Sequence, residues 1–229
     1  MKINILQLLE GARKAEGLTV VIDVFRAFSL GPYAFSKGVE KIIPVADLDL
    51  AFRLKKEHPD YILVGERDEQ KVPGFDFGNS PTHLLESDLK GKTIVHSTSS
   101  GTQGLANAVN AGEILTGSFV HADAIVKYIR KQNPDMVSLV CMGYATEYPI
   151  EEDTFCAEYI RDRLENKKPD FEEMVKIMRK TSGARFFEKE KQSFAPSSDF
   201  ELCTALNRFD FIVKAKQGDE FMVLKQYSV

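Results

Sequence analysis

The sequence has little of what marks several large classes of protein. Its three cysteines are too widely spaced for a zinc knuckle or a disulfide framework, so we expect reduced thiols: Cys141, Cys156 and Cys203. No apolar run approaches the roughly 18 residues that cross a bilayer. The formal net charge of −4 is unlike the clustered basic excess of a general nucleic-acid surface. We therefore expect no membrane and no nucleic-acid partner, whereas a small anionic substrate is still allowed.

Two phosphate-handling signatures are absent as well. The hydroxyl-rich run from Ser97 to Thr102 does not have the G-x-x-x-x-G-K-[ST] form of a P-loop, so it implies no nucleotide. Cys141 closes an apolar segment, but no arginine follows it in residues 142–146, so the phosphate cradle of cysteine phosphatases is missing. We expect Cys141 to be a small buried side chain rather than a nucleophile.

What the chain does contain is enough for a large folded core. Hydrophobic residues make up 43% of its 229 residues, which excludes disorder, and no clear linker separates independent units. We therefore predict a single domain over residues 1–229. Residues 1–6 hold no apolar stretch long enough for a signal peptide, so the expected location is the cytoplasm.

Strand-like and helix-like segments alternate over residues 18–165, which predicts βαβ crossovers and an α/β fold. We expect three layers, α/β/α, around a largely parallel or mixed central sheet. After residue 170 we expect two helices and an antiparallel strand pair around residues 217–219 that closes one edge of the sheet. Exposed edge strands could pair in a homodimer. The expected strands are residues 18–24, 41–45, 61–64, 93–95, 113–115, 137–140, 210–215 and 220–224; the expected helices are residues 27–37, 47–57, 102–110, 119–131, 152–164, 171–179 and 198–206.

Polar residues gather where these strands end. Asp23 and Arg26 close or follow the first buried strand, and Glu66 follows the third. Because the carboxyl ends of parallel strands open onto one crevice, we expect these side chains to meet there, beside the run from Ser97 to Thr102. A loop at residues 71–81 holds two prolines and two glycines, and we expect it to pack beside this site.

Carboxylates at neighbouring strand ends suit a hard cation. An acid at the mouth of a buried strand is costly to desolvate unless a cation or several hydrogen bonds compensate it, and Mg²⁺ prefers oxygen ligands. Asp23 and Glu66 are therefore candidate catalytic and metal-binding residues, with an ion pair to Arg26 as the alternative for Asp23. Arg26 is a candidate catalytic residue that could hold phosphate or carboxylate in a bidentate contact, with an internal bridge to either acid as its alternative.

The turn before residue 103 opens a predicted helix, where unpaired backbone N–H groups and the helix dipole favour an anion. Its members become candidate substrate-binding residues, with helix capping as the alternative, and a second strand-to-helix turn adds one more hydroxyl. Together with Arg26 the candidates are Ser97, Thr98, Ser99, Ser100, Gly101, Thr102 and Ser118. Glu152 and Asp153 stand at another helix start, where acids are stabilising without any catalytic duty.

Several short motifs spread over most of the chain are informative as a set. They are Val21-Ile22-Asp23-Val24-Phe25-Arg26-Ala27, Gly65-Glu66-Arg67, the block from Gly74 to Pro81, Gly101-Thr102-Gln103-Gly104, Gly117-Ser118-Phe119, and Glu152-Asp153 with Cys156-Ala157. This set resembles the 2-phosphosulfolactate phosphatase family, and the resemblance runs from about residue 18 to residue 205. The resemblance implies a Mg²⁺-dependent phosphatase on an α/β fold, acting on phosphate esters of 2-hydroxy acids. It also adds Asp76, Glu152 and Asp153 to Asp23 and Glu66 as candidate metal ligands or acid–base groups.

The implied reaction converts (2R)-2-phospho-3-sulfolactate to 3-sulfolactate and phosphate, with phospholactate and phosphoglycolate as alternative substrates. The Asp-x-Asp pattern of aspartyl-phosphate phosphatases is absent because residue 25 is Phe, which favours metal-activated water over Asp23 as the nucleophile. Two other functions stay open at this point. One is a non-catalytic, metal-dependent binding module for an organic phosphate or sulfonate. The other, a nucleotide-dependent transferase, is disfavoured because both glycine-rich fingerprints are missing.

Overall fold

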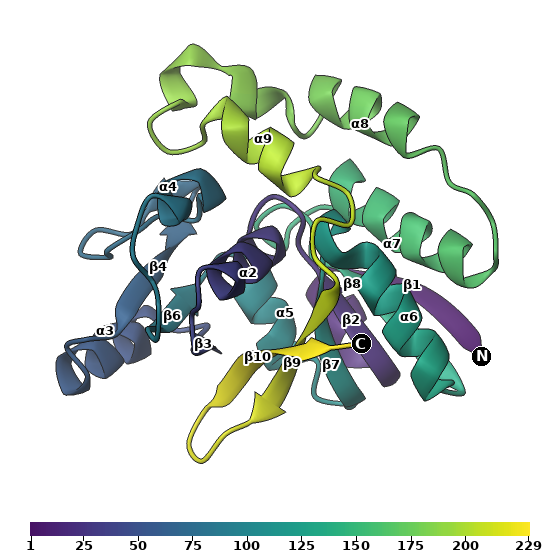
Figure 1. Ribbon diagram of the computed structural model, residues 1–229, viewed down its shortest axis with the longest axis horizontal. Coiled ribbons are helices and arrows are strands. Elements are labelled where there is room, and N and C mark those ends of the chain that lie inside the picture. The colour runs from purple at the N-terminus through teal and green to yellow at the C-terminus, as the bar shows by residue number, and fades with distance from the viewer.

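Ten strands form one mixed sheet in the computed structural model, which describes residues 1–229 (Figure 1). The strands are β1 Lys2–Gln7, β2 Gly17–Ile22, β3 Lys41–Pro44, β4 Ile62–Arg67, β5 Gln70–Lys71, β6 Thr93–Ser97, β7 Ala111–Gly117, β8 Met136–Cys141, β9 Phe211–Gln217 and β10 Met222–Ser228. The α-helices are α1 Leu8–Lys14, α2 Ala27–Ser36, α3 Leu48–Glu57, α4 Pro81–Leu85, α5 Gly101–Asn107, α6 Ala122–Gln132, α7 Glu151–Leu164, α8 Phe171–Lys180 and α9 Ser197–Cys203, with short 3₁₀ turns η1 Phe119–His121, η2 Ala184–Phe187 and η3 Lys189–Lys191.

Local sequence explains where several helices begin and end. The Asp47 side chain caps α3 by accepting a hydrogen bond from the Asp49 N–H, which satisfies one of the free donors of the first turn. In α6 the residues Ile125, Val126 and Ile129 repeat at helical spacing and are buried on one face. No helix of the structure is long and apolar enough to cross a membrane.

The strand order is β1-β8-β2-β7-β9-β10-β3-β6-β4-β5. We call the strands β1, β8, β2 and β7 the first half-sheet, and β3, β6, β4 and β5 the second half-sheet. All pairs in the first half-sheet are parallel, as are β3–β6 and β6–β4 in the second. Within each half-sheet the carboxyl ends of the parallel strands therefore point the same way, as the alternating pattern predicted, whereas three antiparallel pairings, β7–β9, β9–β10 and β10–β3, separate the two half-sheets.

The C-terminal hairpin corrects one expectation. Strands β9 and β10 are antiparallel as predicted, but they lie between the two half-sheets rather than at an edge (Figure 1, yellow). β9 pairs with β7 through Ile114↔Ala215, and β10 pairs with β3 through Leu224↔Ile42. The hairpin side chains Ile212, Val213 and Leu224 are buried, which suits a central pair of strands covered on both faces.

Helices cover both faces of the sheet, which confirms the α/β fold class. In β2, Leu18, Val20 and Ile22 belong to a core cluster shared with α6 and α7. Val21, which points the other way, belongs to a cluster shared with α1, α2 and α5. This alternation along one strand is what a sheet buried on both sides requires.

The N-terminal strand was not predicted. β1 pairs in parallel with β8 along its whole length and forms one edge of the sheet. Its residues are only half-buried or exposed, so the run lacks the continuous apolar character of β2 and β8. Weak patterning is typical of an edge strand and explains why the sequence did not reveal it.

Candidate active-site pocket

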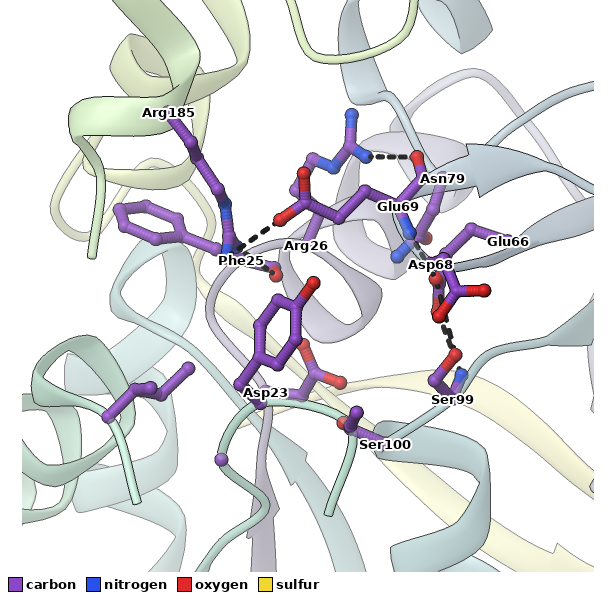
Figure 2. A pocket seen from close by; sticks show the side chains of 14 residues that line it. Asp23, Phe25, Arg26, Glu66, Asp68, Glu69, Asn79, Ser99, Ser100 and Arg185 are labelled. Atoms are coloured by element: carbon purple, nitrogen blue, oxygen red, sulfur yellow. Dashed lines mark hydrogen bonds and ion pairs between the residues drawn. The ribbon is translucent and has the colours of Figure 1, made fainter. Parts of the chain in front are cut away.

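A polar pocket lies where the carboxyl ends of the two half-sheets meet (Figure 2). The connections that follow β2 and β8 in the first half-sheet supply Asp23, Phe25, Arg26, Gly143, Tyr144 and Ala145. The second half-sheet and its loops supply Glu66, Asp68, Glu69, Asn79, Ser99 and Ser100. Ile150 before α7 and Arg185 in η2 complete the wall. The pocket therefore stands at the switch point between two sets of parallel strands, where open α/β sheets bind ligands.

Asp23 directly follows β2 and lines this pocket while being only 6% exposed. Its Oδ1 accepts a hydrogen bond from the Ala27 N–H at 3.2 Å. Burial, together with the nearby charges of Glu66 and Glu152, raises the pKa of the Asp23 carboxyl to about 7, although the hydrogen bond from Ala27 opposes the rise. Arg26 does not pair with Asp23, so this acid is left without a cation from the chain.

Glu66 occupies the end of β4 and holds two turns together. Its Oε1 accepts from the Ser99 N–H at 2.7 Å, and its Oε2 accepts from the Glu69 N–H at 3.0 Å. The Ser99 hydroxyl donates to the same Oε2 at 3.3 Å. The side chain thus ties the β4–β5 turn to the loop after β6 while still lining the pocket.

Two acids at the start of α7 differ sharply in their surroundings. Asp153 accepts from the Val24 N–H at 2.8 Å and from the Gly143 N–H at 2.9 Å, so both of its oxygens are used. Glu152 is fully buried, and neither carboxylate oxygen has a hydrogen-bond partner. Its nearest cation is Arg185, with Nη2 4.0 Å from Oε1. Burial raises the pKa of both carboxyls, and for Glu152 the charge of Arg185 opposes that rise.

Arg26 lines the pocket, but most of its guanidinium is committed to the chain. Its Nη1 donates to Asp199 Oδ2 at 2.8 Å and to the Phe194 carbonyl at 2.5 Å, and its Nη2 donates to the Glu69 carbonyl at 3.2 Å. The Asp199 side chain is fully buried and accepts two further hydrogen bonds, from the Ser80 hydroxyl and the Thr82 N–H. The predicted internal bridge of Arg26 is therefore real, but its partner is Asp199 rather than Asp23 or Glu66.

The predicted hydroxyl cluster separates into two groups. Ser99 and Ser100 line the pocket, as expected for substrate-binding candidates. The others do not line it. Thr98 and Thr102 hydrogen-bond to each other's backbone N–H groups, which is the helix-capping alternative. The remaining members of the set are used elsewhere: the Ser97 hydroxyl accepts from Arg67, the Ser118 hydroxyl donates to the Phe28 carbonyl, and Gly101 packs beside Asp23.

Gly101 matters through its lack of a side chain rather than through an anion contact. A Cβ atom at this position would lie 2.8 Å from Asp23 Oδ2 and 3.0 Å from both the Ala27 Cβ and the Phe28 ring. Those distances are too short for any larger residue without movement of the pocket wall. The glycine therefore lets the start of α5 approach the Asp23 carboxylate.

Asp76 is not brought to the pocket, which corrects its place among the metal-ligand candidates. Its Oδ2 accepts from the Leu63 N–H at 2.8 Å and pairs with Lys55 at 3.1 Å. Leu63 lies near the start of β4, whereas Glu66 lies near its end, so the strand separates the two acids. The loop from residue 71 to 81 does pack down as predicted, with Phe75 buried and Phe77 bridged to Val64.

Two functional neighbours escaped the sequence analysis. Arg185 lies on η2 and Asp199 on α9, both far along the chain from the strand ends that they contact. Neither residue stands at a strand end or in one of the motifs that carried the resemblance. Asp199 falls in the first turn of the helix expected at residues 198–206, where an acid is stabilising without any catalytic duty, so local pattern gave no reason to connect it with Arg26.

The donor chemistry of the pocket suits a hard cation. Nowhere in the structure do three or more His, Cys, Asp or Glu side chains converge closely enough to form a ready metal site. However, Asp23, Glu66 and Glu152 are near enough for the latter two to raise the pKa of Asp23. The two unpartnered oxygens of buried Glu152 are the strongest sign that a positive group belongs beside them.

Fold and pocket together define an α/β protein that gathers buried acids and arginines at its strand ends, a composition suited to an anionic substrate. A family model described as 2-phosphosulpholactate phosphatase matches residues 3–218. A probable 2-phosphosulfolactate phosphatase of Carboxydothermus hydrogenoformans is 35% identical over 235 residues, with 98% of each chain covered. One of Bacillus subtilis is 30% identical over 213 residues, with 91% of each covered. The chain belongs to the 2-phosphosulfolactate phosphatase family, and thereby to the phosphoric monoester hydrolases, which confirms the resemblance.

Proposed function

We propose that this protein is a Mg²⁺-dependent phosphatase acting on phosphate esters of 2-hydroxy carboxylic acids, with (2R)-2-phospho-3-sulfolactate as its main substrate. Family membership supports the reaction class. The observation that supports the metal is Glu152, a fully buried carboxylate with no hydrogen-bond partner, which lies behind the pocket lining but close enough to raise the pKa of Asp23; Asp23 and Glu66 themselves line the pocket. Such a group is stable as an anion only beside a compensating charge.

Asp23, Glu66 and Glu152 are the residues that would hold the metal. When bound, Mg²⁺ polarises a phosphoryl oxygen and neutralises charge that develops in the transition state. Glu66 arrives already oriented, because hydrogen bonds from Ser99 and Glu69 fix its carboxylate. Asp153 keeps the neighbouring backbone in place through Val24 and Gly143, so it acts as a positioning residue and not as a ligand.

The arginines of the pocket neutralise the rest of the substrate. Arg26 presents the donors that its ion pair with Asp199 leaves free, and Arg185 reaches the pocket from η2, beside Phe25 (Figure 2). A carboxylate of the acid cluster orients the attacking water. Phosphoryl transfer asks mainly for positioning and charge neutralisation, and these groups supply both. Trapping of a phosphoaspartate on Asp23 would instead make that residue the nucleophile.

The test is phosphate release from 2-phosphosulfolactate, 2-phospholactate and an aryl phosphate, each with Mg²⁺ and with EDTA. We expect release that requires the metal and favours the 2-hydroxy-acid esters. Asp23→Asn should lower kcat by roughly 10²- to 10³-fold, the size of loss seen when one charge-stabilising group is removed. Asp76→Asn is the matched control, because Asp76 lies outside the pocket. Wild-type protein that releases no phosphate with any divalent cation would end the proposal.

A metal-dependent binding module for an organic phosphate or sulfonate is the second candidate. It would use the same donors, because a metal held by Asp23 and Glu66 would bind a phosphate or sulfonate whether or not the ester is then hydrolysed. The excess of acids over arginines speaks against it, since carboxylates repel an anionic ligand unless they hold a metal. Binding of 2-phosphosulfolactate in Mg²⁺ buffer, with the ester recovered intact, would favour this candidate.

A further inference from the structure

Arg185 lies in the pocket wall. One nitrogen of its guanidinium is held by a backbone carbonyl, and the other contacts a carboxylate that a ligand could replace. Its Nη2 donates to the Phe25 carbonyl at 3.1 Å and lies 4.0 Å from Oε1 of the buried Glu152, while its Nη1 lies 3.2 Å from Glu69 Oε1. The charged group also packs over the rings of Tyr144 and Phe186, 5.7 and 5.2 Å from their centroids. These contacts fix the place of the arginine and leave one side of its fork toward the pocket (Figure 2).

Glu69 can lose its contact with Arg185 with little loss of stability. Glu69 is 15% exposed at its side chain and has a second cation, Lys191, 3.8 Å from Oε2. Its backbone is held independently, because its N–H donates to Glu66 and its carbonyl accepts from Arg26. If Arg185 turns to another anion, Glu69 keeps both a positive neighbour and its position.

The other arginine of the pocket has no such freedom. Arg26 is paired with the fully buried Asp199, and breaking that pair would strand a buried carboxylate. Of the two pocket arginines, only Arg185 has a carboxylate partner that a ligand can replace. A substrate carboxylate would replace the Glu69 carboxylate like for like, in the planar two-point contact that a guanidinium prefers.

We propose that Arg185 is the specificity-determining residue of this pocket: it binds the carboxylate next to the ester oxygen of the substrate, taking it in exchange for Glu69. The inference rests on the proposed function and adds a division of labour to it. The acids Asp23, Glu66 and Glu152 serve the phosphate end, and Arg185 serves the carboxylate end. Phosphate esters without a neighbouring acid gain no direct contact from this arginine, whose only link to the acids of the phosphate end is its 4.0 Å approach to Glu152.

The first test compares Arg185→Gln with wild type on three esters. We expect kcat/KM to fall roughly 10- to 100-fold more for 2-phosphosulfolactate and 2-phospholactate than for an aryl phosphate, mainly through KM, because any loss through the contact with Glu152 is common to all three esters. Arg185→Lys should recover only part of the loss, because it keeps the charge without the fork. Arg161→Gln, on an exposed ion pair with Asp162, is the control for loss of an arginine. An equal loss on all three esters, or a loss confined to the sulfonate-bearing ester, overturns the assignment.

A second variant should change KM for 2-phospholactate in the opposite direction. Glu69→Gln removes the competitor of the substrate carboxylate, so KM for 2-phospholactate should fall roughly two- to fivefold, with the aryl phosphate unaffected. A merely structural role for the Arg185–Glu69 pair would make both variants worse. Unchanged or raised KM for 2-phospholactate in Glu69→Gln contradicts the exchange.

Calorimetric binding of 2-phospholactate separates this inference from the proposed function. Wild-type protein that binds the ester without hydrolysing it, and loses the binding in Arg185→Gln, would remove the phosphatase proposal and retain the role of Arg185. Protein that hydrolyses the ester while Arg185→Gln binds it as tightly as wild type would do the reverse.

Discussion

Each half-sheet uses one carboxylate to hold two of its turns together, but only one of the two carboxylates lines the pocket. In the first half-sheet, Asp153 joins the turns after β2 and β8 by accepting the N–H groups of Val24 and Gly143. In the second, Glu66 joins the turns after β4 and β6 by accepting the N–H groups of Glu69 and Ser99. Asp153 lies behind the pocket wall, whereas Glu66 is part of that wall.

This difference distinguishes a predicted acid that holds the backbone in place from one that can also bind a ligand. Asp153 uses both carboxylate oxygens to accept hydrogen bonds from buried backbone N–H groups, so it has little capacity to bind a ligand. Glu66 has the same kind of hydrogen bonds but faces the pocket, so it can both hold turns and meet a ligand. Asp23 accepts a hydrogen bond from the Ala27 N–H, whereas Glu152, which does not line the pocket, has no hydrogen-bond partner and only Arg185 as a cation, 4.0 Å away. The pocket is therefore built where two stabilised turns meet around Asp23, with Glu152 buried behind its lining.

The largest effect is expected where the two halves are fastened together. Asp199 pairs with Arg26, which follows β2, and accepts from Ser80 and Thr82 at the start of α4. Asp199→Ala leaves the arginine buried without its partner, so we expect the free energy of unfolding to fall by about 3–5 kcal/mol. Urea denaturation measures it. Asp162→Ala, on the exposed pair with Arg161, should cost no more than about 1 kcal/mol. Equal costs for the two variants would mean that Asp199 does not fasten the halves.

Each half also carries one buried histidine that should make the fold sensitive to acid. Burial lowers the pKa of His96, on β6, and of His121, on η1, to about 4. Between about pH 6.5 and pH 4 the unfolded chain binds a proton at each position and the folded chain does not, so stability falls as the pH falls through this window. The loss is on the order of 3 kcal/mol per histidine.

The measurement is chemical denaturation at a series of pH values for wild type and for His96→Gln and His121→Gln. Each variant should flatten the acid side of the stability profile by a similar amount, since both rings are equally buried. A profile with an unchanged slope in either variant would show that the corresponding ring is protonated in the folded protein.

Alanine variants of Asp153 and Glu66 should rank in one order by loss of stability and in the opposite order by loss of activity. Asp153→Ala leaves two buried N–H groups unpaired, and we expect a loss of about 2–3 kcal/mol in the free energy of unfolding. Glu66→Ala leaves the N–H groups of Glu69 and Ser99 without this acceptor but facing the pocket, and we expect a loss of about 1 kcal/mol in the free energy of unfolding. For phosphate release at a temperature where both variants are folded, Glu66→Ala should be the more damaged. The same order in both measurements would remove the distinction between the two acids.

The smallest effect is expected at the predicted ligand that the structure places elsewhere. Asp76→Asn keeps one oxygen to accept from the Leu63 N–H and loses only a half-exposed ion pair with Lys55. We expect a change of less than about 1 kcal/mol in stability and no change in phosphate release or in its dependence on Mg²⁺. A raised metal requirement in this variant would return Asp76 to the ligand set.

The fold could be predicted where apolar runs are continuous and failed where pairing is decided at long range. β2 and β8 were found because both faces of each strand are buried. The edge strand β1 lacks that signature. The hairpin was recognised from its local pattern, but its place in the middle of the sheet depends on contacts with β7 and β3, which no local pattern records.

The site follows the same division. Asp23, Glu66 and Ser99 meet because they end parallel strands, and that rule can be applied to a sequence. Arg185 and Asp199 come from segments beyond the regular alternation, so their approach to the pocket depends on how α8, η2 and α9 pack over the strand ends (Figure 1). The single-domain prediction and the choice of metal ligands stay predictions.

The central position of the hairpin has a consequence for the order in which the protein can be completed during synthesis. Both half-sheets leave the ribosome before β9 and β10 do, yet β7 and β3, which already pair with β2 and β6, obtain their second partners only from that hairpin. Until residues 211–228 emerge, each half carries an unpaired inner edge, the kind of surface on which nascent chains associate wrongly. Strands β9 and β10, which are made after both halves, therefore turn two separate halves into one sheet.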